Sequence, residues 1–240
     1  YRAMFGGRGE YRRGLLLWMS HPAWPSMVWQ TYDYYFEPTG AYFGCKKACE
    51  PLHIQLNRYT GNVEVVNYHA GLREGLTATA QVLDMHGTLL AGYSEDLSLD
   101  EDKTIFFPLV LPENLTDVYY VKLSLSDGSG GICSNFYVQG KEEGNFRALR
   151  SLPRPSLRAS CSGKGPWKVK LENSGGEPAL MIKLSLRAGG DMVAPVIYSD
   201  NYLSLMPGES ALVTIEAAPE DVHGKPSVEI SAFNLNPYTI

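Results

Sequence analysis

Alternation of apolar and polar residues marks two stretches of the chain. The alternating segments are Thr77–Val82 and Val121–Ser126 in the first stretch, and Trp167–Glu172, Ile182–Arg187 and Val228–Ala232 in the second. A period of two is typical of antiparallel strands that bury one face. Each stretch therefore predicts a small β-sandwich, the first over residues 57–145 and the second over residues 152–240.

Turn-forming sequences separate the alternating segments. They are Asp84–Gly87, Asp127–Gly131, Asn173–Gly176 and Met206–Glu209, and their spacing is that of short strands in a sandwich. Between the two stretches, Gly140–Pro155 combines charged residues with two prolines, which block helix formation. This segment is predicted to be the linker between the sandwiches.

Residues 1–56 follow a different pattern. The continuous apolar run Leu15–Met19 is typical of a strand buried on both faces, as in a parallel sheet or a barrel. Ser20–Tyr42 is rich in aromatic residues and interrupted by three prolines, which predicts a long irregular loop. A short helix is expected around Cys45 and Cys49. We expect the part from Pro25 to His53 to pack on the first sandwich through its aromatic side chains.

Charge and hydropathy exclude two classes of partner. The 240 residues include 21 basic and 26 acidic side chains, a net charge of −5, and no basic cluster stands out, which argues against nucleic-acid binding. The longest apolar run is Leu15–Met19, too short to span a membrane. The sequence starts at Tyr1 without an initiator Met or a signal peptide, so we expect a mature or truncated chain. As a separate expectation, we place the chain outside the cytoplasm, secreted or periplasmic.

The cysteines offer a weak candidate for a metal site. Cys45, Cys49 and His53 follow a four-residue step, but Pro51 should end the helix and interrupt their common face. Cys133 and Cys161 are isolated in the sequence. We therefore expect free thiols, with no metal and no cofactor.

Carboxylate and aromatic side chains are the two kinds of residue that carbohydrate chemistry uses most. A retaining glycosidase needs two carboxyl groups about 5–5.5 Å apart, and nothing marks Asp33, Glu37 or Glu50 as such a pair rather than as loop carboxylates with local partners. Aromatic side chains, in contrast, are concentrated in one segment, where they could stack on sugar rings or simply pack. They are Trp18, Trp24, Trp29, Tyr32, Tyr34, Tyr35, Phe36, Tyr42 and Phe43.

Three longer motifs stand out before residue 57, namely Leu15–Ser26, Trp29–Tyr35 and Gly40–His53. Together they resemble the end of the catalytic barrel in glycoside hydrolase family 2, in the exo-β-D-glucosaminidase and β-mannosidase-like branch. Tyr198–Tyr202 and Leu205–Ser210 resemble the last immunoglobulin-like domain of such enzymes. The resemblance implies an all-β chain of two immunoglobulin-like sandwiches, preceded over residues 1–56 by the end of a (β/α)₈ barrel.

The same resemblance implies a function. The chain would be the C-terminal accessory region of a retaining β-glycosidase, with carbohydrate and the rest of the barrel as its partners. The two catalytic glutamates of the family lie on earlier barrel strands and match no position here, so no catalytic residue is expected. The alternative is a stand-alone carbohydrate-binding or adhesion module of two sandwiches.

Trp24 is the candidate substrate-binding residue. If Leu15–Met19 is the last barrel strand, the residues that follow it reach the sugar site, because barrel sites lie at the carboxyl ends of the strands. Trp24 is the first large aromatic residue there. Packing beneath Pro25 is the alternative.

Overall fold

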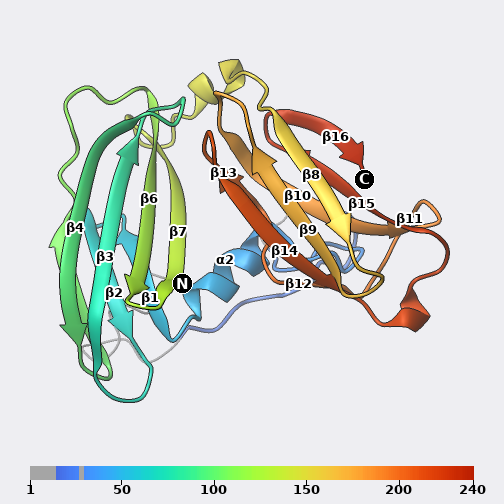
Figure 1. The fold of residues 1–240 in the computed structure, drawn as a ribbon, viewed down its shortest axis with the longest axis horizontal. Coiled ribbons are helices and arrows are strands. Elements are labelled where there is room, and N and C mark those ends of the chain that lie inside the picture. Colours follow the sequence, from blue (N-terminus) through green and yellow to red (C-terminus); the bar gives the residue numbers. More distant parts are fainter. Residues whose placement is uncertain (1–14, 27–29) are drawn as a thin grey trace. The chain divides into compact units, whose positions relative to one another are not determined.

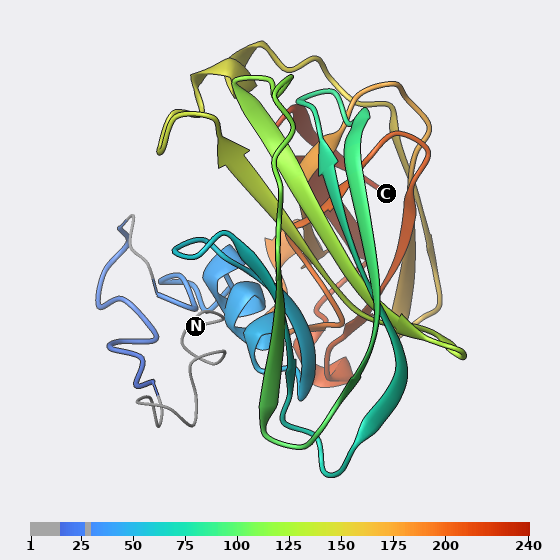
Figure 2. The same cartoon turned by 90° about the vertical axis from the view of Figure 1, so that its left-hand side faces the viewer.

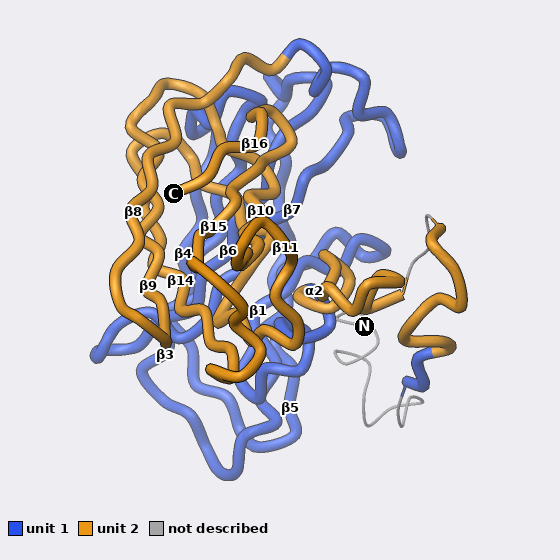
Figure 3. The backbone as a smooth tube through the Cα atoms, turned by 90° about the vertical axis from the view of Figure 1, so that its right-hand side faces the viewer, with its two compact units in different colours: residues 1–17, 44–151 blue, residues 18–43, 152–240 orange. Residues whose placement is uncertain are grey.

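The computed structural model describes residues 15–26 and 30–240, which form two compact units (Figure 3). The first unit contains residues 15–17 and 44–151, and the second contains residues 18–43 and 152–240. Each unit has two antiparallel sheets, and most of the regular structure is β (Figure 1). The prediction of an all-β chain with two sandwiches is confirmed.

The first sandwich consists of two sheets. One has three strands in the order β1-β2-β5, and the other has four strands in the order β4-β3-β6-β7. The short helix α2 precedes it in the chain, and the 3₁₀-helix η1 follows it. The elements are α2 (Gly40–Ala48), β1 (Leu52–Asn57), β2 (Asn62–Asn67), β3 (Arg73–Leu83), β4 (Leu89–Leu99), β5 (Lys103–Pro108), β6 (Val118–Asp127), β7 (Gly130–Gly140) and η1 (Arg147–Ser151).

The second sandwich also consists of two antiparallel sheets, with four and five strands. One sheet has the order β12-β14-β9-β8; the other has the order β11-β10-β15-β16, with β13 also paired to β10. The elements are β8 (Leu157–Ser162), β9 (Trp167–Asn173), β10 (Ala179–Ala188), β11 (Asp191–Met192), β12 (Ile197–Tyr198), β13 (Leu203–Leu205), β14 (Ser210–Glu216), the 3₁₀-helix η2 (Pro219–Asp221), β15 (Pro226–Ala232) and β16 (Leu235–Thr239).

Each sandwich has its own apolar core, built by the alternation seen in the sequence. In β9, alternate residues from Trp167 to Asn173 are buried and those between them are exposed. Val121, Leu123 and Leu125 are fully buried in the first core, and Leu184 and Ile230 are fully buried in the second. Burial of such side chains contributes about 1.5–3 kcal/mol each, which makes these cores the main source of stability.

A buried asparagine occupies the same place in both sandwiches. At the end of β2, Asn67 Nδ2 donates to the carbonyl oxygens of Gly71 and Leu99, at 3.0 Å in both cases. At the end of β9, Asn173 Nδ2 donates to Glu177 O at 2.8 Å and Leu205 O at 3.0 Å. The acceptors lie at the same sequence offsets from the two asparagines, so the sandwiches are structural repeats.

The segment before the sandwiches differs from the expected one in two respects. Leu15–Met19 forms no strand, and a barrel segment is not evident among the described residues. A strand requires a hydrogen-bonded neighbour, and no described residue pairs with this run. In addition, β1 already starts at Leu52, so residues 52–56 belong to the first sandwich rather than to the preceding segment. The helix ends at Ala48, three residues before Pro51.

Candidate functional site

The apolar run and the aromatic residue after it are exposed. Leu16 has 97% of its surface exposed, Trp18 has 78% and Trp24 has 68%. Trp24 does not pack beneath its neighbours, and its carbonyl oxygen accepts a hydrogen bond from Ser26 Oγ at 3.3 Å. Trp29 lies outside the described residues. Leu16, Trp18 and Trp24 are therefore large apolar side chains that the described chain leaves mostly uncovered.

The described residues 20–26 and 30–39 form no helix or strand (Figure 2), and local hydrogen bonds join them. The Tyr32 amide donates to Ser20 O at 3.0 Å, and Thr39 donates from its amide to Thr31 O at 3.0 Å. Asp33 Oδ1 accepts from the amides of Tyr35 and Glu37, each at 2.9 Å. These bonds hold together the described part of a loop that precedes α2, here called the aromatic loop (residues 18–26 and 30–39).

Glu37 anchors the aromatic loop to the second sandwich. Its carboxylate accepts hydrogen bonds from Lys183 Nζ at 2.6 Å and from Ser185 Oγ at 2.5 Å, and its side chain is only 15% exposed. Lys183 and Ser185 lie on β10, between the buried Ile182, Leu184 and Leu186. The expectation that Pro25–His53 packs on the first sandwich is wrong for the described residues up to Phe43, because the loop covers the polar face of β10 instead, whereas residues 44–53 belong to the first unit.

Inner aromatic side chains extend this contact. Phe43 is buried, with its ring centroid 6.0 Å from that of Tyr202 and 6.4 Å from that of Tyr198. Tyr42 packs edge-on against Phe43 at 5.1 Å and lies 5.4 Å from Tyr32. Burial, followed by the nearby Glu37 carboxylate, raises the pKa of Tyr202 to about 12. For these residues, packing is the correct interpretation of the aromatic cluster.

Outer aromatic side chains of the loop remain exposed. The ring of His21 stacks on that of Phe36 at 4.2 Å, and His21 Nε2 lies 3.2 Å from Tyr34 O. Phe36 is 64% exposed, Tyr35 is 59% exposed and Tyr34 is 40% exposed. With His21 they form a group of aromatic faces on a loop whose base is fixed by Glu37, and Trp24 is exposed elsewhere on the same loop. Such a group is typical of a surface that binds a partner or a sugar.

The carboxylates considered as catalytic candidates have local partners. Asp33 accepts backbone N–H groups, Glu37 binds Lys183 and Ser185, and Glu50 Oε2 lies 3.2 Å from His53 Nδ1. The structure does not bring any of these carboxylates together as an acid and nucleophile pair. Their arrangement agrees with loop carboxylates that stabilise structure.

The candidate metal residues are separated by the end of the helix. Cys45 lies within α2, Cys49 follows it, and His53 lies in β1. All four cysteines are free thiols, and burial raises the pKa of Cys45 and of Cys161. Among the described residues, no three His, Cys, Asp or Glu side chains are grouped as metal ligands would be. No helix in that part of the chain is both long and apolar enough to cross a membrane.

Comparisons with known proteins agree with this architecture. A family model described as the exo-β-D-glucosaminidase Ig-fold domain matches residues 135–235. The exo-β-D-glucosaminidase of Streptomyces avermitilis is 32% identical over 260 residues, which covers 95% of this chain and 29% of the relative. The mannosylglycoprotein endo-β-mannosidase of Lilium longiflorum is 25% identical over 295 residues, covering 93% of this chain and 31% of the relative.

A solved structure shows the same arrangement of strands. The exo-chitosanase CsxA of Amycolatopsis orientalis superposes with a TM-score of 0.89 at 28% identity, over 99% of this chain and 32% of that chain. The chain thus spans about a third of the length of the proteins it matches. Residues 135–235 match the Ig-fold domain of exo-β-D-glucosaminidases, and the resemblance of the chain to the exo-β-D-glucosaminidase and β-mannosidase-like branch of glycoside hydrolase family 2 is confirmed.

Proposed function

We propose that this chain is the C-terminal accessory region of a retaining β-glycosidase, where it completes the catalytic barrel and forms one wall of the sugar site. The relatives named exo-β-D-glucosaminidase support a β-linked amino sugar as the substrate of the whole enzyme. In this role the second sandwich holds the aromatic loop in place, and the chain does not catalyse hydrolysis by itself.

The observation that carries the proposal is the exposure of Leu16 in the apolar run and of Trp18 and Trp24 on the anchored loop. Burying a large apolar side chain is worth about 1.5–3 kcal/mol, so these three positions represent several kcal/mol available to a partner. The relatives are about three times longer than this chain, and the proposed partner is the barrel that the remaining length would supply.

The order of these residues also supports the proposal. Leu15–Met19 would pair with the neighbouring barrel strands, and the residues after it would then lie at the carboxyl end of the barrel, where sites of this architecture occur. Trp24 would present a flat apolar face to the sugar. The alternative, a stand-alone binding module, would not need the exposed apolar run Leu15–Met19 in addition to its exposed aromatic side chains.

Complementation between two purified pieces tests this proposal. The chain and the part of its reading frame that precedes Tyr1 are expressed separately and then mixed, and hydrolysis of an aryl β-D-glucosaminide is measured. We expect no turnover by either piece alone, turnover by the mixture, and a loss of more than tenfold in the mixture when Leu16→Asp is introduced. Phe106→Asp, at a 65% exposed position in β5, is the matched control and should leave turnover unchanged.

Turnover by the isolated chain, or full activity of the preceding part without it, would contradict the proposal. The role of Trp24 needs a separate measurement in the joined enzyme. Trp24→Ala should raise KM about fivefold to thirtyfold, because it removes a stacking face, while Trp24→Phe should retain most of the affinity. An unchanged KM in Trp24→Ala would remove Trp24 from the sugar site.

A further inference from the structure

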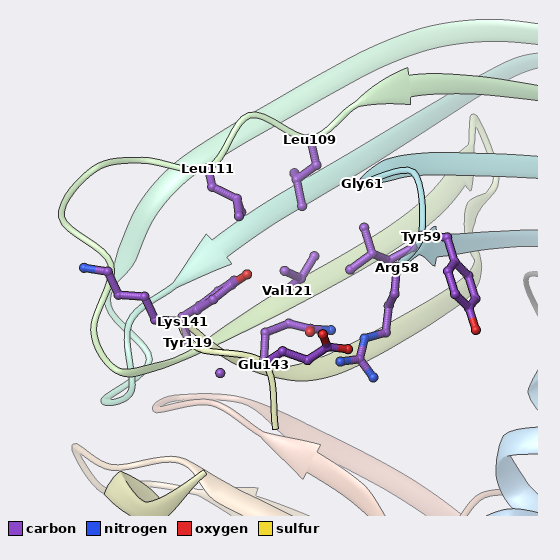
Figure 4. A pocket seen from close by; sticks show the side chains of 12 residues that line it. Arg58, Tyr59, Gly61, Leu109, Leu111, Tyr119, Val121, Lys141 and Glu143 are labelled. Carbon is purple, nitrogen blue, oxygen red and sulfur yellow. The ribbon is translucent and has the colours of Figure 1, made fainter. Parts of the chain in front are cut away.

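The first sandwich contains a pocket that the proposed function does not use (Figure 4). Its volume is about 440 Å³, within the usual range for small-molecule sites. All its lining residues lie between Leu56 and Glu143, so it belongs entirely to the first unit. It is formed by the turn between β1 and β2, by the segment after β5, and by β6 and the end of β7.

Two buried polar side chains face this pocket without a protein partner. Tyr119 on β6 and Gln139 on β7 stand directly opposite each other in the antiparallel register, so their side chains lie on the same face. Tyr119 is 7% exposed and Gln139 is 8% exposed, and both line the pocket. Within residues 15–26 and 30–240, no side-chain hydrogen bond ties the phenol or the amide to the protein, and neither is among the fully enclosed polar atoms. Their polar groups therefore reach the open space of the pocket, where a ligand can form hydrogen bonds with both.

The rest of the pocket combines an apolar surface with a charged entrance. Leu109, Leu111 and Val121 provide aliphatic contact, while Arg58 and Glu143 carry opposite charges (Figure 4). Burial raises the pKa of Tyr119, and the positive charge of Arg58 partly offsets this rise. The Arg58 guanidinium is therefore close enough to the phenol to influence it. Tyr59 and Lys141 also line the pocket, and Tyr59 is 96% exposed.

This combination selects among ligand classes. An amide and a phenol can each donate and accept hydrogen bonds, as the neighbouring hydroxyl groups of a sugar require. The leucines and Val121 suit the C–H face of a pyranose ring, and the exposed Tyr59 ring offers a stacking surface. Glu143 disfavours a simple anion, and the charged entrance disfavours a purely apolar molecule.

We propose that this pocket is an accessory saccharide-binding site that takes one pyranose ring, with Tyr119 and Gln139 bound to its hydroxyl or amino groups. Arg58 and Glu143 complete the polar contacts at the entrance, and Tyr59 stacks on the next ring of a longer chain. The site does not depend on the proposed function, because it lies wholly in the first sandwich and needs no barrel. Failure of complementation with the barrel would leave it unaffected.

Binding is tested on the full 240-residue chain by nuclear magnetic resonance titration. The probes are D-glucose, D-glucosamine, cellobiose and chitobiose, with inorganic phosphate as the anion. We expect millimolar binding of at least one disaccharide, with the largest shifts at the Gln139 side-chain amide and at backbone amides around Arg58 and Lys141. Phosphate should neither produce these shifts nor compete.

Variants assign the binding to this pocket. Gln139→Leu, which conserves volume, and Tyr119→Phe should each weaken binding about tenfold, the usual effect of leaving a buried polar partner unpaired. The matched control is Tyr120→Phe, because the Tyr120 hydroxyl donates to Met85 O at 3.0 Å on the opposite face of β6. Thermal unfolding of each variant checks that the sandwich is intact.

Several outcomes would overturn the proposal. These are the absence of saccharide binding, binding that shifts residues outside the pocket, and binding that Gln139→Leu and Tyr119→Phe leave unchanged. Phosphate binding at Arg58 and Lys141 without saccharide binding would equally overturn it, because it would identify an anion site.

Discussion

Replacing Glu37 should release the aromatic loop from the second sandwich. The Glu37 carboxylate accepts two short hydrogen bonds, from Lys183 Nζ and Ser185 Oγ, and is 15% exposed. Glu37→Gln keeps an acceptor for Ser185 but leaves the Lys183 ammonium without its counter-charge. A hydrogen bond to a charged group is worth about 1.5–3 kcal/mol, and the lower end applies because Lys183 is 32% exposed.

The expected cost is therefore about 1.5–2 kcal/mol, or about tenfold to thirtyfold in the opening equilibrium of the loop. Native-state hydrogen exchange measures it at the amides of Tyr32 and Thr39, which donate to Ser20 O and Thr31 O within the loop. Exchange at these amides should accelerate by that factor in Glu37→Gln. Amides in β9 and β14 should change much less, because the core of the sandwich is retained.

A matched ion pair on the same sandwich provides the control. Arg187 Nη2 and Glu229 Oε1 lie 3.1 Å apart, and both side chains are about one-third exposed. Such an exposed pair is worth about 0.2–1 kcal/mol, so Glu229→Gln should change exchange by less than about fivefold, without acting on the loop. Equal exchange of Tyr32 and Thr39 in wild type and Glu37→Gln would refute the anchoring role. So would a double-mutant cycle with Lys183→Met that shows no coupling.

Three further predictions concern tyrosines, glycines and cysteines. Burial raises the pKa of Tyr198 and of Tyr202 from 10.0, so above pH 10 the unfolded state binds fewer protons than the folded state. The free energy of unfolding of the second sandwich, followed by urea titration, should fall with rising pH by up to about 1.4 kcal/mol per pH unit for each tyrosine; a flat profile would contradict this. Gly140→Ala should destabilise the first sandwich by about 1–3 kcal/mol in thermal unfolding, because the added Cβ atom would lie 2.5 Å from Glu142 O and 2.6 Å from Asn145 O. The control is Gly44→Ala in α2, which should be neutral or stabilising, because its Cβ atom would meet no atom within 4 Å. Iodoacetamide should modify the exposed Cys49 before the half-buried Cys45, whose pKa is raised by burial, and mass spectrometry showing the reverse order would count against it.

The sequence by itself determined the strands and their buried faces. Alternation in Trp167–Glu172 and Val121–Ser126 is a local property, because successive side chains of a strand point to opposite faces. The structure buries Val169, Leu171, Val121, Leu123 and Leu125. Pro51 likewise limits α2 through the conformation it imposes on the residues before it. The repeat of the sandwich pattern in residues 57–145 and 152–240 could be seen for the same reason.

Only the tertiary structure decided what covers each face. Lys183 and Ser185 occupy the polar positions of β10, where alternation predicts contact with solvent, yet Ser185 is 2% exposed because Glu37 and its loop lie on it. Likewise, Leu15–Met19 has the composition of a buried strand but remains exposed, since a strand needs a neighbour that the run itself does not encode. Side-chain periodicity fixes the direction in which a residue points. The partner it meets depends on contacts between residues far apart in the chain.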